Sequence, residues 1–342
     1  AQFEEAFAAQ LGVPYASAVS SGTAGLHLAL RAAGVSDGAE VITSPFSFVA
    51  SANVAIYERA RPVFADIDAV TLNLSPEAAA AAVTERTAAI LPVHVFGYPA
   101  DIPALERLGL PIVEDACEAL GAVHPDGSAV GAGGGHPAVF GFYPNKQLTT
   151  GEGGMVTTAD PLLKERLDSE RNQGRAPDMG WLDHDRLGFN YRLSDIACAL
   201  GLAQLGHLRS MLDGRARVAG WYREALSGIE ELALPCSDAG GARRGWFVYV
   251  VQLPRGVDRD ETVRALGERG IPSKPYFPAI HLMSFYRERF GHREGEFPVC
   301  EDVAARSVAL PFHPALSEGQ VARVAGELSA VLAGARAARA GT

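Results

Sequence analysis

The sequence is short of cysteine and of positive charge, and each shortage argues against a class of function. Four cysteines occur in 342 residues, at positions 117, 198, 236 and 300, and their spacing matches no metal site. We therefore expect free thiols and a reducing, cytoplasmic location. Lys and Arg number 30 against 40 Asp and Glu, so the net charge is -10 at pH 7. This charge argues against nucleic acid as a partner, because a duplex-binding protein needs a basic surface.

Long apolar runs and an initiator methionine are missing as well. No run is long enough to span a bilayer, and the opening AQFEEAFAAQLG is typical of an amphipathic helix rather than a signal peptide. We therefore expect a soluble protein with no membrane partner, and a further segment ahead of residue 1.

Two common phosphate-binding loops are also absent. The pattern G-x-x-x-x-G-K does not occur, and GAGGGH has His136 where a dinucleotide-binding loop needs its last glycine.

The chain can bury a large core, because 48% of its 342 residues are hydrophobic. Over its first two-thirds, short β-type runs alternate with helical patterns, which predicts a mainly parallel sheet covered by helices. A long helical pattern with a bend at Gly214 follows, and the composition then shifts. We predict a large domain over 1–212 and a smaller α+β domain over 213–342. The expected strands lie at 15–19, 40–43, 61–66, 88–93, 111–114, 138–142, 154–158 and 246–253, and the expected helices at 23–33, 46–57, 76–84, 101–108, 160–172, 193–226, 259–269 and 317–335.

One lysine lies in an unusual setting. The stretch VFGFYPNKQLTTGEGGMVTT, residues 139–158, places Lys146 among turn-forming residues between two β-type runs. An amine held by rigid flanks can lose its solvation and its proton together, which makes it a nucleophile for carbonyl groups. The alternative for a loop lysine is a solvated surface charge.

A carboxylate occupies a second distinctive position. The stretch LPIVEDACEALGA, residues 110–122, is typical of a buried strand that ends near Asp115, where an open parallel sheet binds ligands. Pyridoxal phosphate requires a lysine for a Schiff base and an acidic partner for its pyridine nitrogen, so this one cofactor explains Lys146 and Asp115 together. The alternative for Asp115 is the N-cap of a following helix.

A third stretch offers a place for a phosphate. In PYASAVSSGTAGLHLALRAAG, residues 14–34, a short strand is followed by Ser21, Gly22 and Thr23 and then by an apolar helix. Small residues at a helix start leave backbone N–H groups free to face an anion, and the helix dipole favours a phosphate there. The alternative is that Ser21 or Thr23 only caps the helix.

These stretches and four more follow the order of the DegT/DnrJ/EryC1/StrS family, which the chain resembles from near residue 1 to beyond residue 315. This family comprises the sugar aminotransferases of fold type I, which use pyridoxal phosphate. The resemblance implies an α/β fold with a mainly parallel seven-stranded sheet and a smaller C-terminal domain. The segments that carry it are SSGTAGLHLAL at Ser20, SPFSFVASANVAIY at Ser44, PVFADID at Pro62, LPVHVFGYPADI at Leu91, VEDACEALGA at Val113, FYPNKQLTTGEGGMV at Phe142 and GFNYRLSDIACALGLAQL at Gly188.

The resemblance also implies roles for single residues. Lys146 is expected to form the Schiff base and move the substrate proton, and Asp115 to pair with the pyridine nitrogen. Gly22 and Thr23 match the phosphate cradle, and Phe48 matches an aromatic that stacks on the cofactor ring. The alternative for Phe48 is an ordinary core aromatic.

Asn190, in GFNYR, matches an asparagine that reaches the partner subunit's cofactor phosphate, so the resemblance implies a homodimer with shared active sites. The alternative for Asn190 is a turn former. Two positions depart from the family pattern. Gly141 replaces a common phosphate-binding serine, which leaves Ser21 or Thr149 to fill that role. Glu118 stands where Gln or His is common near the cofactor's phenolic oxygen, and we keep it as a cofactor-binding candidate.

The substrate side is predicted from the same resemblance. His94, Tyr276 and His281 match positions that line the sugar pocket. Basic residues that could meet a diphosphate or the donor carboxylate are Arg192, Arg243, Arg244 and Lys274.

The predicted activity is transfer of an amino group from an amino-acid donor, L-glutamate first, to the keto group of a nucleotide-linked deoxysugar by a ping-pong mechanism. A free keto sugar, a cyclitol or another ketone stays open as the acceptor, because no motif fixes the nucleotide. A dehydratase branch of the family has histidine in place of the lysine, and Lys146 argues against it. A regulatory protein that binds the cofactor without turnover is the alternative from another class. The pair of Lys146 and Asp115 and the lack of a DNA-binding module disfavour it.

Overall fold

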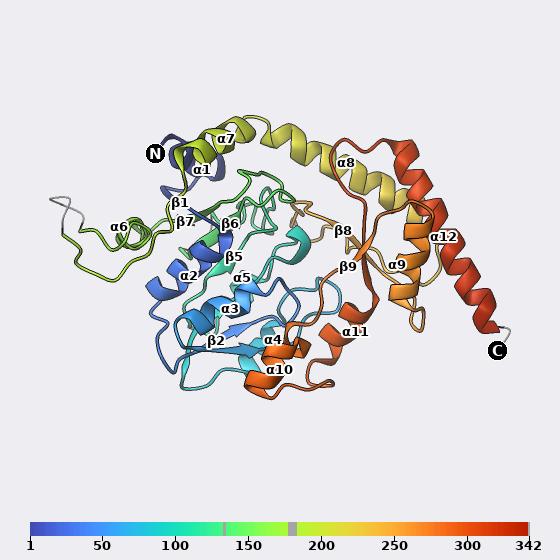
Figure 1. Cartoon of the computed structure of the whole chain (residues 1–342), viewed down its shortest axis with the longest axis horizontal. Helices are drawn as coiled ribbons and strands as arrows, with labels where there is room; N and C mark the ends of the chain where they lie inside the picture. The colour runs from blue at the N-terminus through green and yellow to red at the C-terminus, as the bar shows by residue number, and fades with distance from the viewer. Residues whose placement is uncertain (133–134, 177–182, 341–342) are drawn as a thin grey trace.

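The computed structural model describes residues 1–132, 135–176 and 183–340 (Figure 1). The sequence over 174–188 is polar and interrupted by Pro177, which predicts a mobile or interface segment, but residues 177–182 of it lie outside the described residues. The strands are β1 (Tyr15–Val19), β2 (Glu40–Thr43), β3 (Arg61–Phe64), β4 (Thr87–Leu91), β5 (Glu114–Asp115), β6 (Ala138–Gly141), β7 (Gly154–Thr158), β8 (Tyr249–Gln252), β9 (Lys274–Pro275) and β10 (Ser307–Leu310). The α-helices are α1 (Gln2–Leu11), α2 (Gly22–Ala32), α3 (Ala50–Tyr57), α4 (Pro76–Ala81), α5 (Ile102–Glu106), α6 (Pro161–Glu170), α7 (Asp195–Leu205), α8 (Leu208–Leu226), α9 (Arg259–Glu268), α10 (Ser284–Phe290), α11 (Pro298–Arg306) and α12 (Glu318–Ala340). Two 3-10 turns are η1 (Val95–Gly97) and η2 (Ile280–Leu282).

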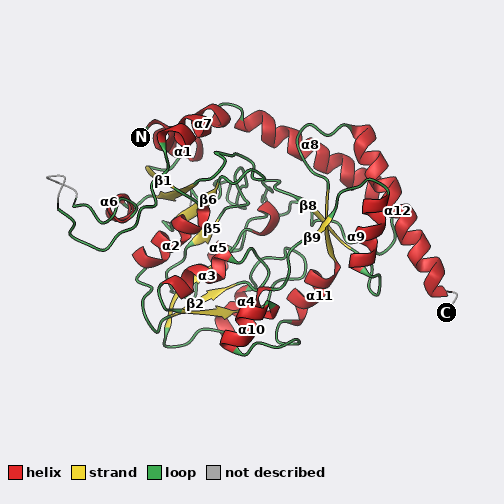
Figure 2. Ribbon diagram, viewed as in Figure 1, coloured by secondary structure: helices red, strands yellow, loops and turns green. Residues whose placement is uncertain are grey.

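The strands β1 to β7 form one layer in the middle of the larger part of the molecule (Figure 2). Their order is β1-β7-β6-β5 in one sheet and β3-β2-β4 in another, and parallel bridges join Ile90 to Ile112 and Val93 to Asp115 between β4 and β5. β7 is antiparallel to β1 and β6, and the other pairings in this layer are parallel. The mainly parallel sheet predicted from the sequence is therefore confirmed.

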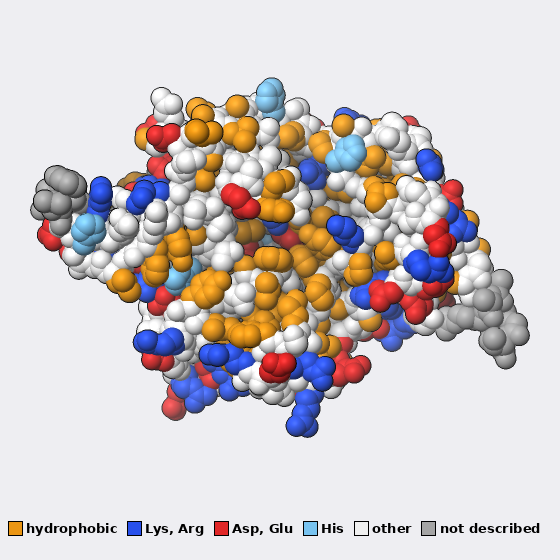
Figure 3. All heavy atoms as spheres, in the orientation of Figure 1, with side chains coloured by type: hydrophobic (Ala, Val, Ile, Leu, Met, Phe, Trp, Pro, Cys, Tyr) orange, Lys and Arg blue, Asp and Glu red, His pale blue; other side chains and the backbone are white. Residues whose placement is uncertain are grey.

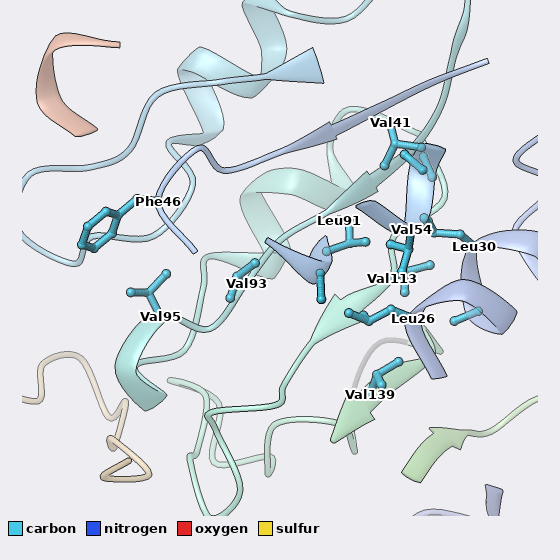
Figure 4. Close-up of a cluster of buried hydrophobic side chains, with 14 of the residues drawn as sticks. Leu26, Leu30, Val41, Phe46, Val54, Leu91, Val93, Val95, Val113 and Val139 are labelled. Atoms are coloured by element: carbon cyan, nitrogen blue, oxygen red, sulfur yellow. The ribbon is translucent and has the colours of Figure 1, made fainter. Parts of the chain in front are cut away.

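Alternate side chains of the central strands enter cores on opposite faces of the layer. In β6, Val139 packs with Leu26 of α2 and Val54 of α3 (Figure 4). The next residue, Phe140, packs with Phe7 of α1, and their ring centroids are 5.2 Å apart. Strands covered on both faces have few polar positions, which is why short apolar runs predicted them.

The C-terminal part has its own sheet, with the order β8-β10-β9, and a core shared with α8, α9 and α12. The predicted domain boundary at residue 212 falls inside α8, whose Leu208 belongs to an N-terminal core and whose Val218 belongs to the C-terminal core. Residues further on, including Phe277 and Val303, pack back into the core of α2 and α3. The division into 1–212 and 213–342 therefore stays a prediction. None of the helices in the described ranges has the length and apolarity needed to cross a membrane.

The bend predicted at Gly214 is wrong, and so is the single helix over 193–226. The helical pattern is interrupted at Gly206 and His207, between α7 and α8, and Gly214 lies buried within α8. A Cβ added at Gly214 would lie 2.8 Å from Cβ of Pro314 and 3.0 Å from its carbonyl oxygen. This glycine is needed for close packing against another segment.

Replacing Gly214 by alanine is therefore expected to destabilise the protein, by about 1 to 3 kcal/mol, because the added methyl group overpacks the contact with Pro314. The matched control is Gly220→Ala in the same helix, where nothing lies within 4 Å of the added Cβ. This control should stabilise the protein by up to about 1 kcal/mol, the usual difference in helix propensity. Chemical unfolding of both variants measures the difference, and equal stability of the two would contradict the packing argument.

Candidate active site

The candidate site lies at the carboxyl ends of β5 and β6, which are adjacent parallel strands. Asp115 is the last residue of β5, and Lys146 lies in the turn that follows β6. The first residue of α2, Gly22, is close to both strand ends, because a Cβ there would lie 2.7 Å from Sγ of Cys117 and 3.3 Å from Cα of Gly141. The fold thus brings together the three stretches that the sequence singled out.

Lys146 is largely enclosed by protein. Its side chain is 15% exposed, and its Nζ lies 3.5 Å from Oε1 of Glu118. The same Nζ lies 4.1 Å from the centroid of the Phe247 ring. This setting differs from the solvated surface charge that is the alternative for a loop lysine.

Two buried carboxyl groups accompany the amine. Burial raises the pKa of Asp115 and that of Glu118, and the nearby charge of Lys146 acts in the opposite direction on both. Oδ1 of Asp115 accepts a hydrogen bond from the backbone N–H of Cys117 at 3.1 Å. No helix is assigned directly after Asp115 in the described part of the chain, so the structure offers no helix for it to cap.

The start of α2 has the form of an anion site. Ser21 is the N-cap, and its hydroxyl accepts a hydrogen bond from the N–H of Ala24 at 3.1 Å. The first N–H groups of a helix have no acceptor within the helix, so those of Gly22 and Thr23 are available to a bound group. Thr149 differs from Ser21, since its hydroxyl donates to the carbonyl of Phe142 and accepts from Gly151 within its own loop. Which of the two takes the place of the serine missing at Gly141 stays a prediction.

Two predicted substrate residues have buried rings. His94 has 0% exposure, with Nε2 at 2.9 Å from Oε2 of Glu114 and Nδ1 accepting the N–H of Ala100. His281 also has 0% exposure, and its Nε2 lies 3.0 Å from Oε1 of Glu301. Both rings contact glutamates in this chain, and their role toward a sugar stays a prediction.

Tyr276, the third predicted substrate residue, lies close to the amine. Its ring centroid is 5.7 Å from that of Phe96 and 6.3 Å from that of Phe247, the ring that contacts Lys146. Burial raises the pKa of Tyr276, and the charge of Glu118 adds to that effect. The structure therefore places Tyr276 beside the candidate site.

Some of the predicted basic residues are held by contacts within the protein, and others are exposed. Arg244 is buried between the rings of Tyr98 and Trp246 and donates to the carbonyl of Phe96, so it is used internally. Arg192 donates to Oδ1 of Asn172 at 2.9 Å. Arg243 and Lys274 are exposed, and Lys274 lies on β9.

The contacts of Glu118 were missed by sequence reasoning. Its Oε2 accepts the N–H of Phe96 at 3.0 Å, and its carbonyl accepts from the side-chain amide of Gln147 at 2.5 Å. Gln147 follows Lys146 directly and also donates to the carbonyl of Gly245 at 3.0 Å. Phe247 was missed too, because the run 246–253 was interpreted only as a strand. Only the closeness of Gln147 to Lys146 in sequence could have suggested these links.

Phe48 and Asn190 both lie at the surface of the single chain. Phe48 is 62% exposed, which argues against an ordinary core aromatic. Asn190 is exposed and forms a bridge with Asn172. The carbonyl of the next residue, Tyr191, accepts the N–H of Ser20 at 2.8 Å, so this segment runs beside the loop that precedes α2.

A cavity of about 640 Å³ is present next to the sheet, but it is separate from the amine. Glu114, His124 and Tyr98 are among the residues that line it, whereas Lys146, Asp115 and Glu118 are not. Glu114 and Asp115 are consecutive strand residues and so point to opposite faces.

Comparisons with known proteins agree with this geometry. The DegT/DnrJ/EryC1/StrS aminotransferase family model matches residues 1–329. A GDP-perosamine synthase of Caulobacter vibrioides is 38% identical over 97% of this chain and 89% of its own length. A UDP-N-acetyl-3-dehydro-alpha-D-glucosamine 3-aminotransferase of Acidithiobacillus ferrooxidans is 39% identical over 92% of this chain and 83% of its own. The crystal structure of DesV from S. venezuelae, in complex with a ketimine intermediate, has a TM-score of 0.90 and 36% identity, and the match covers 98% of this chain and 88% of that one.

Proposed function

Because this chain belongs to the DegT/DnrJ/EryC1/StrS aminotransferase family, we propose that it moves an amino group from an amino-acid donor to the keto group of a nucleotide-linked deoxysugar. The family, the fold class and the enzyme class predicted from the sequence are confirmed, and the protein is an aminotransferase that depends on pyridoxal phosphate. The nucleotide is proposed from relatives named for GDP- and UDP-linked sugars. L-Glutamate is the proposed donor, used in a ping-pong cycle.

Pyridoxal phosphate fits the residues that this chain brings together. The start of α2 offers N–H groups for the phosphate, in a cradle so tight that a Cβ at Gly22 would lie 2.7 Å from Sγ of Cys117. Lys146 would hold the cofactor through its amine, and Asp115 would hold a proton on the pyridine nitrogen through its carboxylate. When bound, pyridoxal phosphate supplies an electron-withdrawing ring for the electrons left behind when the donor carbon loses its proton.

The residues of the chain perform the remaining tasks. Nζ of Lys146 would accept and hold the proton that leaves the donor carbon, which requires the amine to be neutral at that moment. The Phe247 ring, 4.1 Å from Nζ, covers one side of the amine and limits the access of water. Phe48, an exposed aromatic, is proposed to stack on the cofactor ring.

The observation that carries this proposal is the enclosed amine, 15% exposed and 3.5 Å from a buried carboxylate, at the carboxyl ends of two parallel strands. The experiment is incubation of the cofactor-loaded protein with L-glutamate, followed by visible absorption. A change from the lysine-bound to the amine-bearing form of the cofactor would support the proposal that the protein is a catalyst. No change with glutamate or any other amino acid would favour a protein that binds the cofactor without turnover.

A homodimer with shared sites belongs to the same proposal. Helix α7 is apolar in composition, yet only its Gly201 is buried within the chain, and Ile196 is 86% exposed. Figure 3 also shows hydrophobic side chains gathered over the middle of one face. A second copy of this chain would cover α7 and bring Asn190, five residues ahead of it, to the partner's α2. We also propose a cytoplasmic location, which is consistent with four free cysteines.

Mixing two inactive variants tests the shared site. Lys146→Ala and Asn190→Ala should each be inactive or nearly so, but a mixed dimer would contain one site with both residues intact. With random subunit exchange at equal amounts, about a quarter of the wild-type activity should return, since half of the dimers are mixed and each has one working site of two.

The matched control mixes Lys146→Ala with Asp115→Asn. In the proposed dimer each site takes Lys146 and Asp115 from the same subunit, so no site of this mixed dimer has both residues intact. No activity should return in this control. Recovery in neither mixture, once subunit exchange is demonstrated, would mean that Asn190 acts within its own subunit.

A further inference from the structure

Gln147, the residue after Lys146, has a buried side chain that joins three segments of the chain. It is 2% exposed, and its side-chain amide donates to the carbonyl of Glu118 at 2.5 Å and to the carbonyl of Gly245 at 3.0 Å. A side-chain amide has two N–H donors, so both are used. Gln147 therefore links the loop of Lys146 to the turn after β5 and to the segment that leads into β8.

The segment at Gly245 is itself packed tightly against the rest of the molecule. Its N–H donates to the carbonyl of Gly97 at 2.9 Å. A Cβ added at Gly97 would lie 1.9 Å from the carbonyl oxygen of Gly245, and a Cβ added at Gly245 would lie 2.7 Å from the backbone nitrogen of Ala122. Three backbone segments thus meet here without room for a side chain. The carbonyl that Gln147 binds is therefore a fixed point rather than part of a loose loop.

The two fixed points also carry the groups that border the amine. Oε1 of Glu118 lies 3.5 Å from Nζ of Lys146. Two residues after Gly245, the ring of Phe247 has its centroid 4.1 Å from the same Nζ. A lysine amine is placed at the end of a flexible four-carbon stem, so its position depends on where its backbone is held and on what surrounds it. The two hydrogen bonds of Gln147 set the backbone of the Lys146 loop relative to both neighbours of the amine.

We propose that Gln147 is a positioning residue that fixes the loop of Lys146 between the turn at Glu118 and the segment of Phe247, and so holds the amine where it bonds the cofactor. Without the two donors, two buried carbonyls would lose a hydrogen bond and the loop would shift toward other partners. A misplacement of about 1 Å in a reacting group can cost about 10²-fold in rate. The inference deepens the proposed function, because it rests on Lys146 as the residue that bonds the cofactor, but it requires no particular sugar acceptor.

The test follows covalent capture of pyridoxal phosphate by cofactor-free protein, by visible absorption, at increasing cofactor concentrations. The curve separates the dissociation constant of the first, non-covalent complex from the first-order rate of capture at saturation. Gln147→Met keeps the length of the side chain but has no donor. Its rate of capture at saturation should fall by about 10-fold to 10²-fold. Its dissociation constant should stay near that of wild type, because Asp115 and the start of α2 are unchanged. A residue that only stabilised the fold would not slow capture by the folded protein.

Two control variants separate position from chemistry and from stability. Gln10→Met makes the same change at an exposed position of α1. Gly214→Ala is expected to destabilise the protein through its contact with Pro314, away from the site. Both should capture the cofactor at the wild-type rate. Gln147→Asn serves as a second variant should Gln147→Met fail to fold, since it keeps the amide but withdraws it from both carbonyls, and its capture should also be slow.

Circular dichroism of each variant shows whether the fold is retained. A Gln147→Met rate of capture equal to those of wild type and of Gln10→Met would overturn the inference. So would an equal slowing in Gly214→Ala, or a weaker non-covalent complex with an unchanged rate of capture. The Lys146→Ala protein makes a failure of the site assignment distinguishable, because it should show no covalent capture at all. Capture by that variant would overturn the assignment of Lys146, on which the role of Gln147 depends.

Discussion

Replacing Lys146 by alanine is expected to abolish transamination, with a loss of at least about 10³-fold, because the variant lacks both the amine that bonds the cofactor and the base that moves the proton. Cofactor should still bind, although without a covalent link, since the start of α2 and Asp115 are unchanged. Activity with a keto sugar and the absorption of the bound cofactor measure the two effects separately.

The matched control is Lys164→Ala. Nζ of Lys164 lies 2.5 Å from Oδ2 of Asp168 and 3.2 Å from the hydroxyl of Ser17, in a surface ion pair that involves none of the site residues. This variant should keep its activity. Borohydride reduction of the loaded wild-type protein, followed by peptide mapping, should place the label on Lys146. A label on Lys164 or Lys274 would refute the assignment.

Replacing Asp115 by asparagine is expected to leave cofactor bound while activity falls by about 10² to 10³-fold. Asparagine can still form a hydrogen bond to the pyridine nitrogen, but it cannot stabilise a positive charge there. Asp126→Asn, which changes an exposed carboxylate of a nearby turn, is the control and should be near normal. Near-normal turnover of the Asp115 variant would mean that Asp115 only accepts the hydrogen bond from the N–H of Cys117 and has no role in catalysis.

Much of the sheet could be predicted from local patterns. The runs expected at 15–19, 40–43 and 154–158 correspond to β1, β2 and β7 residue for residue, because each is a short, fully or mostly buried segment between turn formers. The role of Gly214 in packing could not be predicted from local patterns. Gly214 contacts Pro314, and a contact between residues so far apart in sequence gives no signal near the glycine. The real break at Gly206 and His207 has no proline to mark it.

The site too was only partly predictable, because some of its features depend on contacts between residues that are distant in the sequence. Lys146 and Asp115 could be located from sequence because Asp115 ends one strand and Lys146 follows another, and the carboxyl ends of adjacent parallel strands meet at one edge. The burial of His94 and His281 could not be predicted, because their partners, Glu114 and Glu301, lie 20 residues away in the sequence on other elements. Glu118 was the ambiguous case, and only its contacts with Phe96 and Lys146 place it beside the amine.

The most direct test of the account is transfer of nitrogen from L-glutamate labelled with ¹⁵N to a panel of nucleotide-linked keto deoxysugars, followed by mass spectrometry of the sugar. The panel should vary the nucleotide and the ring position of the keto group, and each sugar should also be supplied without its nucleotide. We expect label in at least one nucleotide-linked sugar, and much less or none in the same sugar without the nucleotide. Label only in free keto sugars, or in no acceptor although glutamate converts the bound cofactor, would contradict the proposed substrate.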